Sequence, residues 1–174
     1  MLNIQMNKVQ VDFDERISEY VKEHTNENIN IKDYIEKIVK QALELNNISF
    51  ENVCISISSA SKEEINKLNL EYRNIDRPTD VLSFPIFERE EIEEFKNIPE
   101  DKKLKEVELG DIVLCMDIIY SQSVEYGTGI IREVLYMITH GVCHLLGYDH
   151  IEADEKVEMR KLEEEILNHL GVSK

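Results

Sequence analysis

The 174-residue chain has no tryptophan, only three prolines and six glycines, and an odd number of cysteines. So few prolines and glycines leave little room for a linker, and the sequence predicts one domain over residues 1–174. The three cysteines, Cys54, Cys115 and Cys143, are widely separated, and the chain start lacks the basic and then apolar profile of a signal peptide. We therefore expect a reduced, cytoplasmic protein.

Long apolar runs and positive charge are also scarce. The longest apolar stretch, Ile112 to Met116, ends at Asp117, whereas a membrane-spanning helix needs roughly 20 apolar residues. This excludes a transmembrane protein. With 36 acidic and 20 basic residues, the formal net charge is -16, which argues against broad electrostatic attraction to nucleic acid or anionic membranes. RNA binding would need a local basic site.

Hydrophobic periodicity predicts interleaved strands and helices, and hence a mixed α and β domain. Strand patterns cover residues 2–6, 53–58, 80–84 and 112–119. Helical patterns cover residues 12–24, 31–45, 61–72, 130–146 and 153–170. A capping box of Ser61 and Glu64 opens the third helix, and Val157 lies in the apolar stripe of the last. The acidic segment 88–108 is predicted to be a solvated loop or a short exposed helix.

The strongest chemical signal is a cluster of three histidines in the string HGVCHLLGYDH, residues 140–150. His140 and His144 are four residues apart on a predicted helix, so they can present ring nitrogens to a single ion. Gly147 can adopt a left-handed conformation that turns the chain and brings back His150 as a third ligand. Three neutral imidazoles suit Zn²⁺ and leave a fourth position for water, as in catalytic zinc sites. The sequence thus predicts one zinc per chain and hydrolytic chemistry.

Other interpretations of the histidines are open. They can be ordinary helix and surface residues, or Cys143 can close a structural site, although it lies about 300° around the helix from His140. The spacing H-x-x-x-H-x-x-G-x-x-H is also that of metzincin peptidases, in which a Glu directly after the first His is the general base. Gly141 occupies that position, so peptide hydrolysis loses its expected catalyst.

Three segments of the sequence resemble the conserved blocks of a known family. HGVCHLLGYDH closely resembles the histidine signature of the YbeY family, bacterial metal-dependent endoribonucleases of ribosomal RNA maturation. YRNIDRPTDVLSFP, residues 72–85, and GDIVLC, residues 110–115, resemble its other blocks in the same order. The resemblance implies an α+β fold: a small mixed sheet of about four strands covered by helices, with the metal site at one end of a central helix.

The resemblance also implies a function and its partners. It implies a single-strand-specific endoribonuclease that acts in rRNA maturation and ribosome quality control, with a ribosomal RNA precursor as substrate. The ribosomal subunit or ribosomal proteins are further expected partners, and a membrane is not. His140, His144 and His150 are expected to bind the metal, taken as zinc. Arg73 is expected to face the metal cleft as a catalytic residue, since a guanidinium can bind phosphate bidentately. Without the resemblance, a surface ion pair would be the favoured role of Arg73.

Four polar residues are weaker candidates. Glu133 lies on nearly the same helix face as the first histidine and could bond a ligand or fix Arg73, but a capping or surface role is equally good. Asp149 could orient the adjacent histidine, although a role in the turn is favoured. Asp80 and Ser83 lie on a strand beside the expected cleft, and structural roles are favoured for both.

Two alternatives to the endoribonuclease are retained. One is a metal-dependent hydrolase of another substrate, such as a peptide or small ester. The other is a non-enzymatic ribosome-assembly factor whose acidic surface meets basic ribosomal proteins. The overall acidity is the main objection to RNA cleavage, because affinity must then come from a local cleft, with Arg73, Arg77 and Arg132 as candidates, or from a partner that supplies the RNA.

Overall fold

A computed structural model describes residues 8–172 except 100, 101 and 103. The strands in this part of the chain are β1 (Lys8–Phe13), β2 (Asn52–Ser59), β3 (Val81–Pro85) and β4 (Glu106–Leu114). The helices are α1 (Arg16–His24), α2 (Ile31–Leu45), α3 (Lys62–Arg73), α4 (Arg89–Phe95), α5 (Met116–Tyr126), α6 (Ile130–Leu145) and α7 (Ala153–His169). No helix in the described ranges is both long and apolar enough to cross a bilayer.

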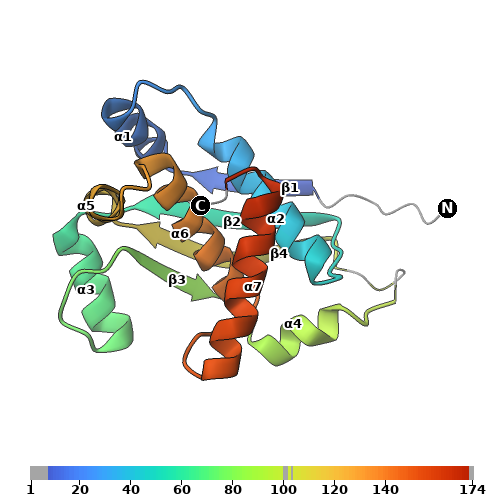
Figure 1. The fold of residues 1–174 in the computed structure, drawn as a ribbon. Coiled ribbons are helices and arrows are strands. Elements are labelled where there is room, and N and C mark those ends of the chain that lie inside the picture. The colour runs from blue at the N-terminus through green and yellow to red at the C-terminus, as the bar shows by residue number, and fades with distance from the viewer. Residues whose placement is uncertain (1–7, 100–101, 103, 173–174) are drawn as a thin grey trace.

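The four strands form one mixed sheet in the order β1-β2-β4-β3 (Figure 1). β1, β2 and β4 run parallel, whereas β3 pairs with β4 in the antiparallel direction at the edge. Parallel neighbours need a crossover connection, which α1 and α2 provide between β1 and β2. The predicted α+β fold with a mixed sheet of four strands is confirmed.

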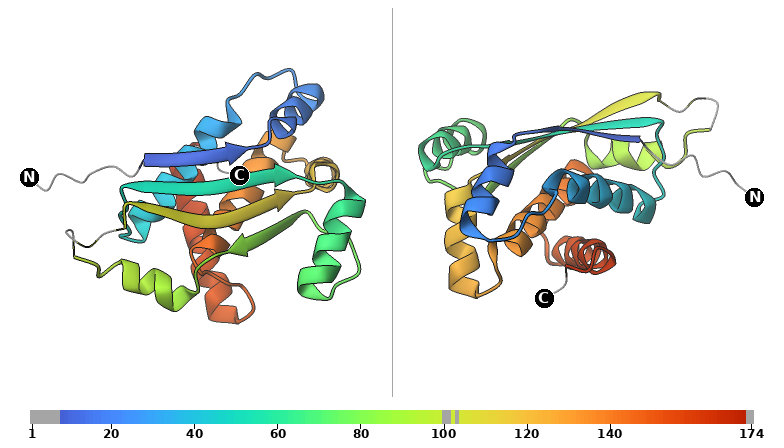
Figure 2. Two further views of the ribbon diagram at one scale, coloured as in Figure 1. Left: turned by 180° about the vertical axis from the view of Figure 1, so that it is seen from behind. Right: turned by 90° about the horizontal axis from the view of Figure 1, so that it is seen from above.

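The helices α2, α6 and α7 cover one face of the sheet (Figure 2). Because successive strand residues point to opposite faces, Val53, Ile55 and Ile57 of β2 are all buried on the helical side. α6 packs against β3 and β4 and is flanked by α2, α5 and α7, with α7 farther from the sheet (Figure 2). α6 is therefore the central helix of the domain.

Gly141 allows α6 to approach the sheet closely. A Cβ atom added at this position would lie 2.6 Å from Cδ1 of Ile112, which is fully buried in β4. Position 141 thus faces the sheet, on the side of α6 that packs against β4. A glutamate could not fit there, which gives a packing reason for the missing peptidase base.

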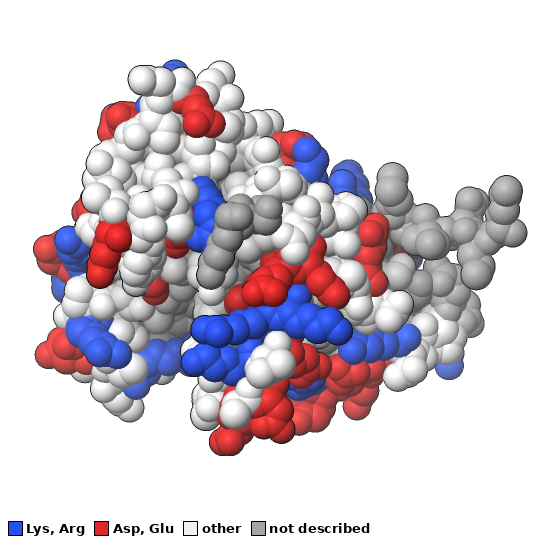
Figure 3. Space-filling view, in the orientation of Figure 1, with Lys and Arg blue, Asp and Glu red and all other residues white. Residues whose placement is uncertain are grey.

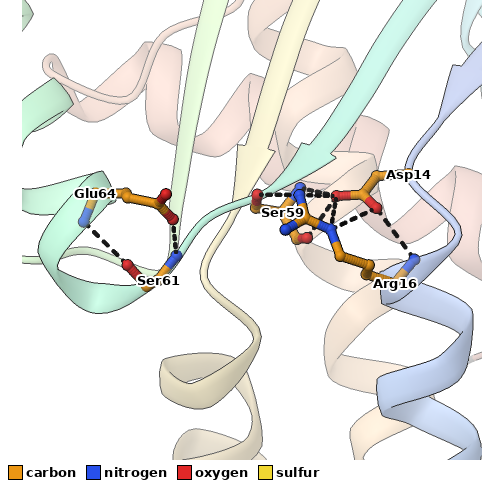
Figure 4. A network of polar contacts seen from close by, with 5 residues as sticks. All are labelled: Asp14, Arg16, Ser59, Ser61 and Glu64. Carbon is orange, nitrogen blue, oxygen red and sulfur yellow. Dashed lines mark hydrogen bonds and ion pairs between the residues drawn. The ribbon is translucent and has the colours of Figure 1, made fainter.

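The ends of β1 and β2 are joined by the carboxylate of Asp14 (Figure 4). It accepts hydrogen bonds from the Ser59 amide at 3.0 Å and hydroxyl at 2.6 Å, and it pairs with Arg16. The Arg16 guanidinium, followed by the bonds from Ser59, holds the pKa of Asp14 well below its usual range. The capping box of Ser61 and Glu64 is present at the start of α3, as predicted (Figure 4).

One predicted strand, at residues 2–6, lies outside the described residues. The first described strand covers Lys8–Phe13, and the helix expected over residues 12–24 begins only at Arg16. The strand predicted over residues 112–119 is wrong beyond Leu114, because α5 begins at Met116. Hydrophobic periodicity cannot tell a buried strand from a buried helical turn over so short a run.

The two acidic helices also differ in detail. Segment 88–108 contains the short helix α4, as one of the two predictions had it. However, Ile92 of this helix is buried and β4 begins at Glu106, so only part of the segment is exposed to solvent. In α7 the expected apolar stripe is shifted: Val157 is 69% exposed, and Met159 takes the buried place. Val157 lies five residues before Leu162, about 140° away around the helix, whereas Met159 lies three residues before it and falls on the buried face.

Candidate metal centre

The three predicted ligands come together at the carboxyl end of α6. His140 and His144 lie one turn apart on the helix, and Gly147, with φ of 81°, turns the chain so that His150 returns to them. One ring nitrogen of each histidine lies within 4.8 Å of the others. The structure therefore assembles the expected group at one end of the central helix.

His140 is oriented by a carboxylate from α7. Its Nδ1 lies 2.6 Å from Oε1 of Glu163, whose side chain is only 4% exposed. The Tyr136 hydroxyl donates a 3.4 Å hydrogen bond to the other oxygen of Glu163. Burial, and then the charge of Glu163, raises the pKa of Tyr136 to about 12, so this hydroxyl stays protonated. A proton on His140 Nδ1 leaves Nε2 as a lone-pair donor.

His144 is oriented by the backbone. Its Nδ1 lies 2.8 Å from the carbonyl oxygen of Tyr148, which can only accept, so Nδ1 carries the proton. Burial, and then the neighbouring His140, lowers the pKa of His144 to about 4, which keeps the ring neutral at pH 7. Tyr148 is itself held by a 2.6 Å hydrogen bond from its hydroxyl to Asn46 and by the Arg89 guanidinium over its ring.

The facing nitrogens fit a bound metal ion. Nε2 of His140 and Nε2 of His144 are 3.1 Å apart, and the bonds made by both Nδ1 atoms leave a lone pair on each Nε2. Two lone pairs at this separation repel each other unless a cation lies between them. Zinc–nitrogen bonds of about 2.0–2.1 Å in a tetrahedral site separate two ligands by about 3.3 Å, close to this spacing. The donor set suits zinc or another divalent ion that imidazole binds.

The third ligand lies on the open side of the centre. The His150 side chain is 52% exposed, and its backbone N–H donates a 2.7 Å hydrogen bond to Oδ1 of Asp149. Asp149 thus supports the turn, which is the role that the sequence favoured. Cys143 lies in the hydrophobic core, where burial raises the pKa of its thiol well above the usual value. A closed site with Cys143 as fourth ligand is excluded by this placement.

Of the roles considered for Glu133, its contacts agree with the one at the beginning of the helix. It is buried, which contradicts a surface role, and its carboxylate accepts a 2.6 Å hydrogen bond from the Thr128 hydroxyl and pairs with Arg132. It stabilises the beginning of α6, two turns from the metal centre, and it bonds to Thr128 and Arg132 rather than to His140 or Arg73.

Arg73 is the last residue of α3, and it is exposed. Its Nη2 donates a 2.9 Å hydrogen bond to the backbone carbonyl of Ser83. Ser83 pairs in the sheet with Ile112, the residue against which Gly141 of α6 packs. Arg73 is therefore anchored to the strand pair that supports the turn of α6 carrying His140.

The other two weaker candidates have structural roles. The Asp80 carboxylate accepts hydrogen bonds from the Val81 backbone and from Nε2 of Gln122, and Ser83 is buried in β3. These places agree with the roles favoured from sequence.

Comparison with known proteins adds an independent observation. The family described as Endoribonuclease YbeY matches residues 17–171, which is most of the chain. The chain belongs to the YbeY family. The match includes all three histidines and Arg73, and extends through the N-terminal third, where the sequence offered no signature.

Curated members of the YbeY family are similar over nearly their whole length. A protein of Thermoanaerobacter sp. (strain X514) is 44% identical over 84% of this chain and 91% of its own. One from Clostridium botulinum (strain Alaska E43 / Type E3) is 42% identical over 80% and 87%, respectively. One from Caldicellulosiruptor saccharolyticus is 41% identical over 83% and 92%. All three are named Endoribonuclease YbeY.

Sequence reasoning about this YbeY family member missed the two groups that orient the ligands. Glu163 had a signal: it lies among Met159, Leu162 and Ile166 at helical spacing, so an acid occupies a core position of α7. A buried acid needs a partner, which here is His140. The carbonyl of Tyr148 had no signal, because a backbone oxygen is present at every residue.

Proposed function

We propose that this chain is a metal-dependent endoribonuclease that cuts single-stranded RNA with one bound zinc ion. The observation that carries the proposal is the pair of Nε2 lone pairs, completed by His150, in a chain of the Endoribonuclease YbeY family. When bound, such a metal polarises a phosphoryl oxygen and activates water for attack on phosphorus. The reaction is hydrolysis of a phosphodiester bond.

Each residue of the proposed active site has a separate role. His140, His144 and His150 hold the metal, and Glu163 with the Tyr148 carbonyl keeps two of the rings in the ligating tautomer. One N–H group of Arg73 donates to the Ser83 carbonyl oxygen, which fixes the guanidinium. Its other N–H groups can then bind phosphate oxygens. We infer that Arg73 positions the scissile phosphate and neutralises charge that develops there.

The substrate we propose is a ribosomal RNA precursor, cut in the cytoplasm during rRNA maturation and ribosome quality control. A net charge of -16 weakens the attraction to naked RNA, so a ribosomal subunit or basic ribosomal proteins would present the substrate. Three free cysteines are compatible with a reducing compartment. Hydrolysis of peptides is less favoured, because position 141 faces the sheet and cannot carry the usual base.

The decisive experiment is cleavage of a labelled single-stranded RNA, compared with the same RNA in a duplex. Metal-loaded protein, chelator-treated protein, His144→Ala and Arg73→Ala are tested beside the controls His169→Ala and Arg16→Ala, which alter exposed residues elsewhere. We expect cleavage of the single strand only, abolished by the chelator and by His144→Ala. Arg73→Ala should lower kcat by about 10²- to 10³-fold, as when a donor to a developing oxyanion is removed.

Other outcomes would point elsewhere. Equal activity in all samples would reveal a contaminating ribonuclease. No cleavage by protein that binds one metal per chain would favour the assembly factor, and salt-sensitive binding to isolated ribosomal subunits would then be its test. Cleavage that survives Arg73→Ala unchanged would remove Arg73 from the mechanism while leaving the metal centre in place.

A further inference from the structure

A cavity of about 890 Å³ lies beside the metal centre, between α5, α6 and α7. Gln122 and Tyr126 of α5, Arg132 and Tyr136 of α6, and Glu163 of α7 contribute to its wall. Its volume is within the range of small-molecule sites, about 300–1,000 Å³. Nothing in the proposed cleavage mechanism uses this space.

The cavity and the metal centre share a wall. Glu163 lines the cavity and also binds Nδ1 of His140. Tyr136 is one helical turn before His140, and the two ring centroids are 6.3 Å apart. An RNA strand with one phosphate at the metal would therefore bring an adjacent nucleotide to the cavity.

The charges of the cavity favour a neutral group over a phosphate. Four carboxylates line it, and they outnumber the two guanidinium groups: Asp80, Glu133, Glu163 and Glu164 against Arg132 and Arg160. Arg132 is already paired with Glu133 and lies over the ring of Tyr136. A phosphate inside would meet a surplus of negative charge, whereas a nucleobase carries none. In Figure 3 basic side chains gather over α7 between acidic ones, so a strand would find positive charge outside the cavity.

Two buried polar atoms of the cavity wall have no hydrogen-bond partner among the described residues: the acceptor Oε1 of Gln122 and the donor Nε of Arg132. Gln122 donates from Nε2 to Asp80 at 2.9 Å, while its Oε1 is buried and has no partner among the described residues. A buried acceptor without a partner destabilises a protein, and a bound donor would remove that penalty. Gln122 lines the cavity, so we assign this unpartnered oxygen as the acceptor for an N–H group of an occupant.

The geometry points to a nucleobase pocket in this cavity, an inference that rests on the proposed endoribonuclease function. The pocket receives one base of the RNA strand, next to the phosphate at the metal, with Tyr126 and Tyr136 as the aromatic surfaces for stacking. The Oε1 atom of Gln122 accepts a hydrogen bond from the exocyclic amino group of cytosine, adenine or guanine. Uracil presents carbonyl oxygens at its edge and one N–H, so it binds less well.

The first test is base preference in cleavage. Metal-loaded protein is given oligouridylates that carry a single cytidine at successive positions, and kcat/KM is compared with that of the all-uridine strand. We expect cleavage to concentrate at a fixed distance from the cytidine, with a roughly three- to tenfold preference. Gln122→Leu should abolish the preference, whereas Gln10→Leu, at an exposed position of β1, should retain it. Equal kcat/KM at every cytidine position would overturn the pocket.

The second test does not depend on cleavage. The side-chain amide signals of Gln122 in ¹⁵N-labelled protein are followed by NMR during titration with cytidine or with uridine. Shifts with cytidine that exceed those with uridine support the pocket even if no RNA is cut, in which case only the proposed function fails. Cleavage of RNA without any cytidine-dependent shift at Gln122 would overturn the pocket and leave the nuclease intact. Because this measurement uses the unaltered protein, it does not depend on the folding of a variant.

Discussion

The geometry of the metal centre depends directly on Glu163, because this buried carboxylate holds Nδ1 of His140 at 2.6 Å. In Glu163→Gln the acceptor loses its charge but keeps nearly the same shape. Loss of such a partner typically weakens metal binding 10- to 100-fold, so we expect zinc affinity to fall by roughly that factor. Competition with a chromogenic chelator measures the change.

The matched control is Glu165→Gln, an exposed position of the same helix. It makes the same chemical change without touching a ligand, so its zinc affinity should equal that of the unaltered protein. If both variants bind zinc equally well, the bond from Glu163 contributes nothing to the centre.

The lowered pKa of Asp14 predicts that its contribution to stability depends on pH. Its pKa is lowered in the folded protein, chiefly by Arg16, so its contribution is complete above the unfolded pKa of about 3.9 and is lost as the pH falls through the folded value. We expect Asp14→Asn to cost about 1 to 2 kcal/mol of unfolding free energy at pH 7, mostly through the bonds from Ser59, since Arg16 is exposed. Urea unfolding at pH 7, 5 and 3 measures the difference.

The gap between the two proteins should be equal at pH 7 and 5 and smaller at pH 3. A gap that stays constant down to pH 3 would mean that the charge of Asp14 does not stabilise the fold. A gap that widens at pH 3 would reverse the sign expected from a lowered pKa.

The role of a single residue could be predicted from the sequence where it depends on local spacing, but not where it depends on tertiary packing. The grouping of the proposed ligands His140, His144 and His150 follows from helical spacing and one glycine turn, which are local. The group that orients His140 comes from a helix 23 residues further along, so only the tertiary packing of α7 on α6 reveals it. Glu133 shows the converse: helical spacing placed it near His140, but a local bond to Thr128 holds it at the beginning of α6.

Among the elements, α6 has a packing constraint that can be tested at Gly141. Alanine there would gain about 1 kcal/mol of helix propensity, but its Cβ would lie 2.6 Å from Cδ1 of the buried Ile112. Overpacking a core costs about 1 to 3 kcal/mol, so we expect Gly141→Ala to lower the unfolding free energy by up to about 2 kcal/mol after the gain in helix propensity. Denaturant unfolding of the metal-free protein measures it.

Ile112→Val supplies the control, because it removes the methyl group that the new Cβ would meet. Alone it should cost about 0.5 to 1.5 kcal/mol, yet combined with Gly141→Ala the loss should be smaller than the sum of the two. Strictly additive losses would show that Gly141 and Ile112 are not coupled.

Sequence patterns predicted elements well where one face is buried and caps are present. α2 and α3 are examples: α2 has a clear apolar stripe, and α3 has the capping box of Ser61. Sequence patterns failed near residue 115, where β4 is followed directly by α5. The apolar segment 112–119 shows no change in hydrophobic periodicity that would mark this boundary. The order of the strands required the structure, because local patterns do not specify which strands pair.

For the whole molecule, charge is the property that most constrains the function. On the face shown in Figure 3, basic side chains gather over α7 between acidic ones, and Arg132 and Arg160 line the cavity beside the histidines. Composition alone predicted that RNA would need a local basic site, and it could not show where. The single-domain organisation of residues 1–174 stays a prediction.

A local site and an extended basic surface differ in how RNA binding responds to salt. Binding of single strands weakens with a log–log slope of about -0.7 for each phosphate neutralised. If Arg73 and one or two further arginines make the contacts, the slope for chelator-treated protein, which binds without cutting, should be about -2. Arg73→Ala should make the slope shallower by about 0.7, while Lys22→Ala, on the exposed side of α1, should leave it unchanged. Fluorescence anisotropy of a labelled RNA at several salt concentrations measures the slope. A slope steeper than about -5 would require many more phosphate contacts than two or three arginines provide, and the RNA would then have to lie along a face of the protein rather than at a local site.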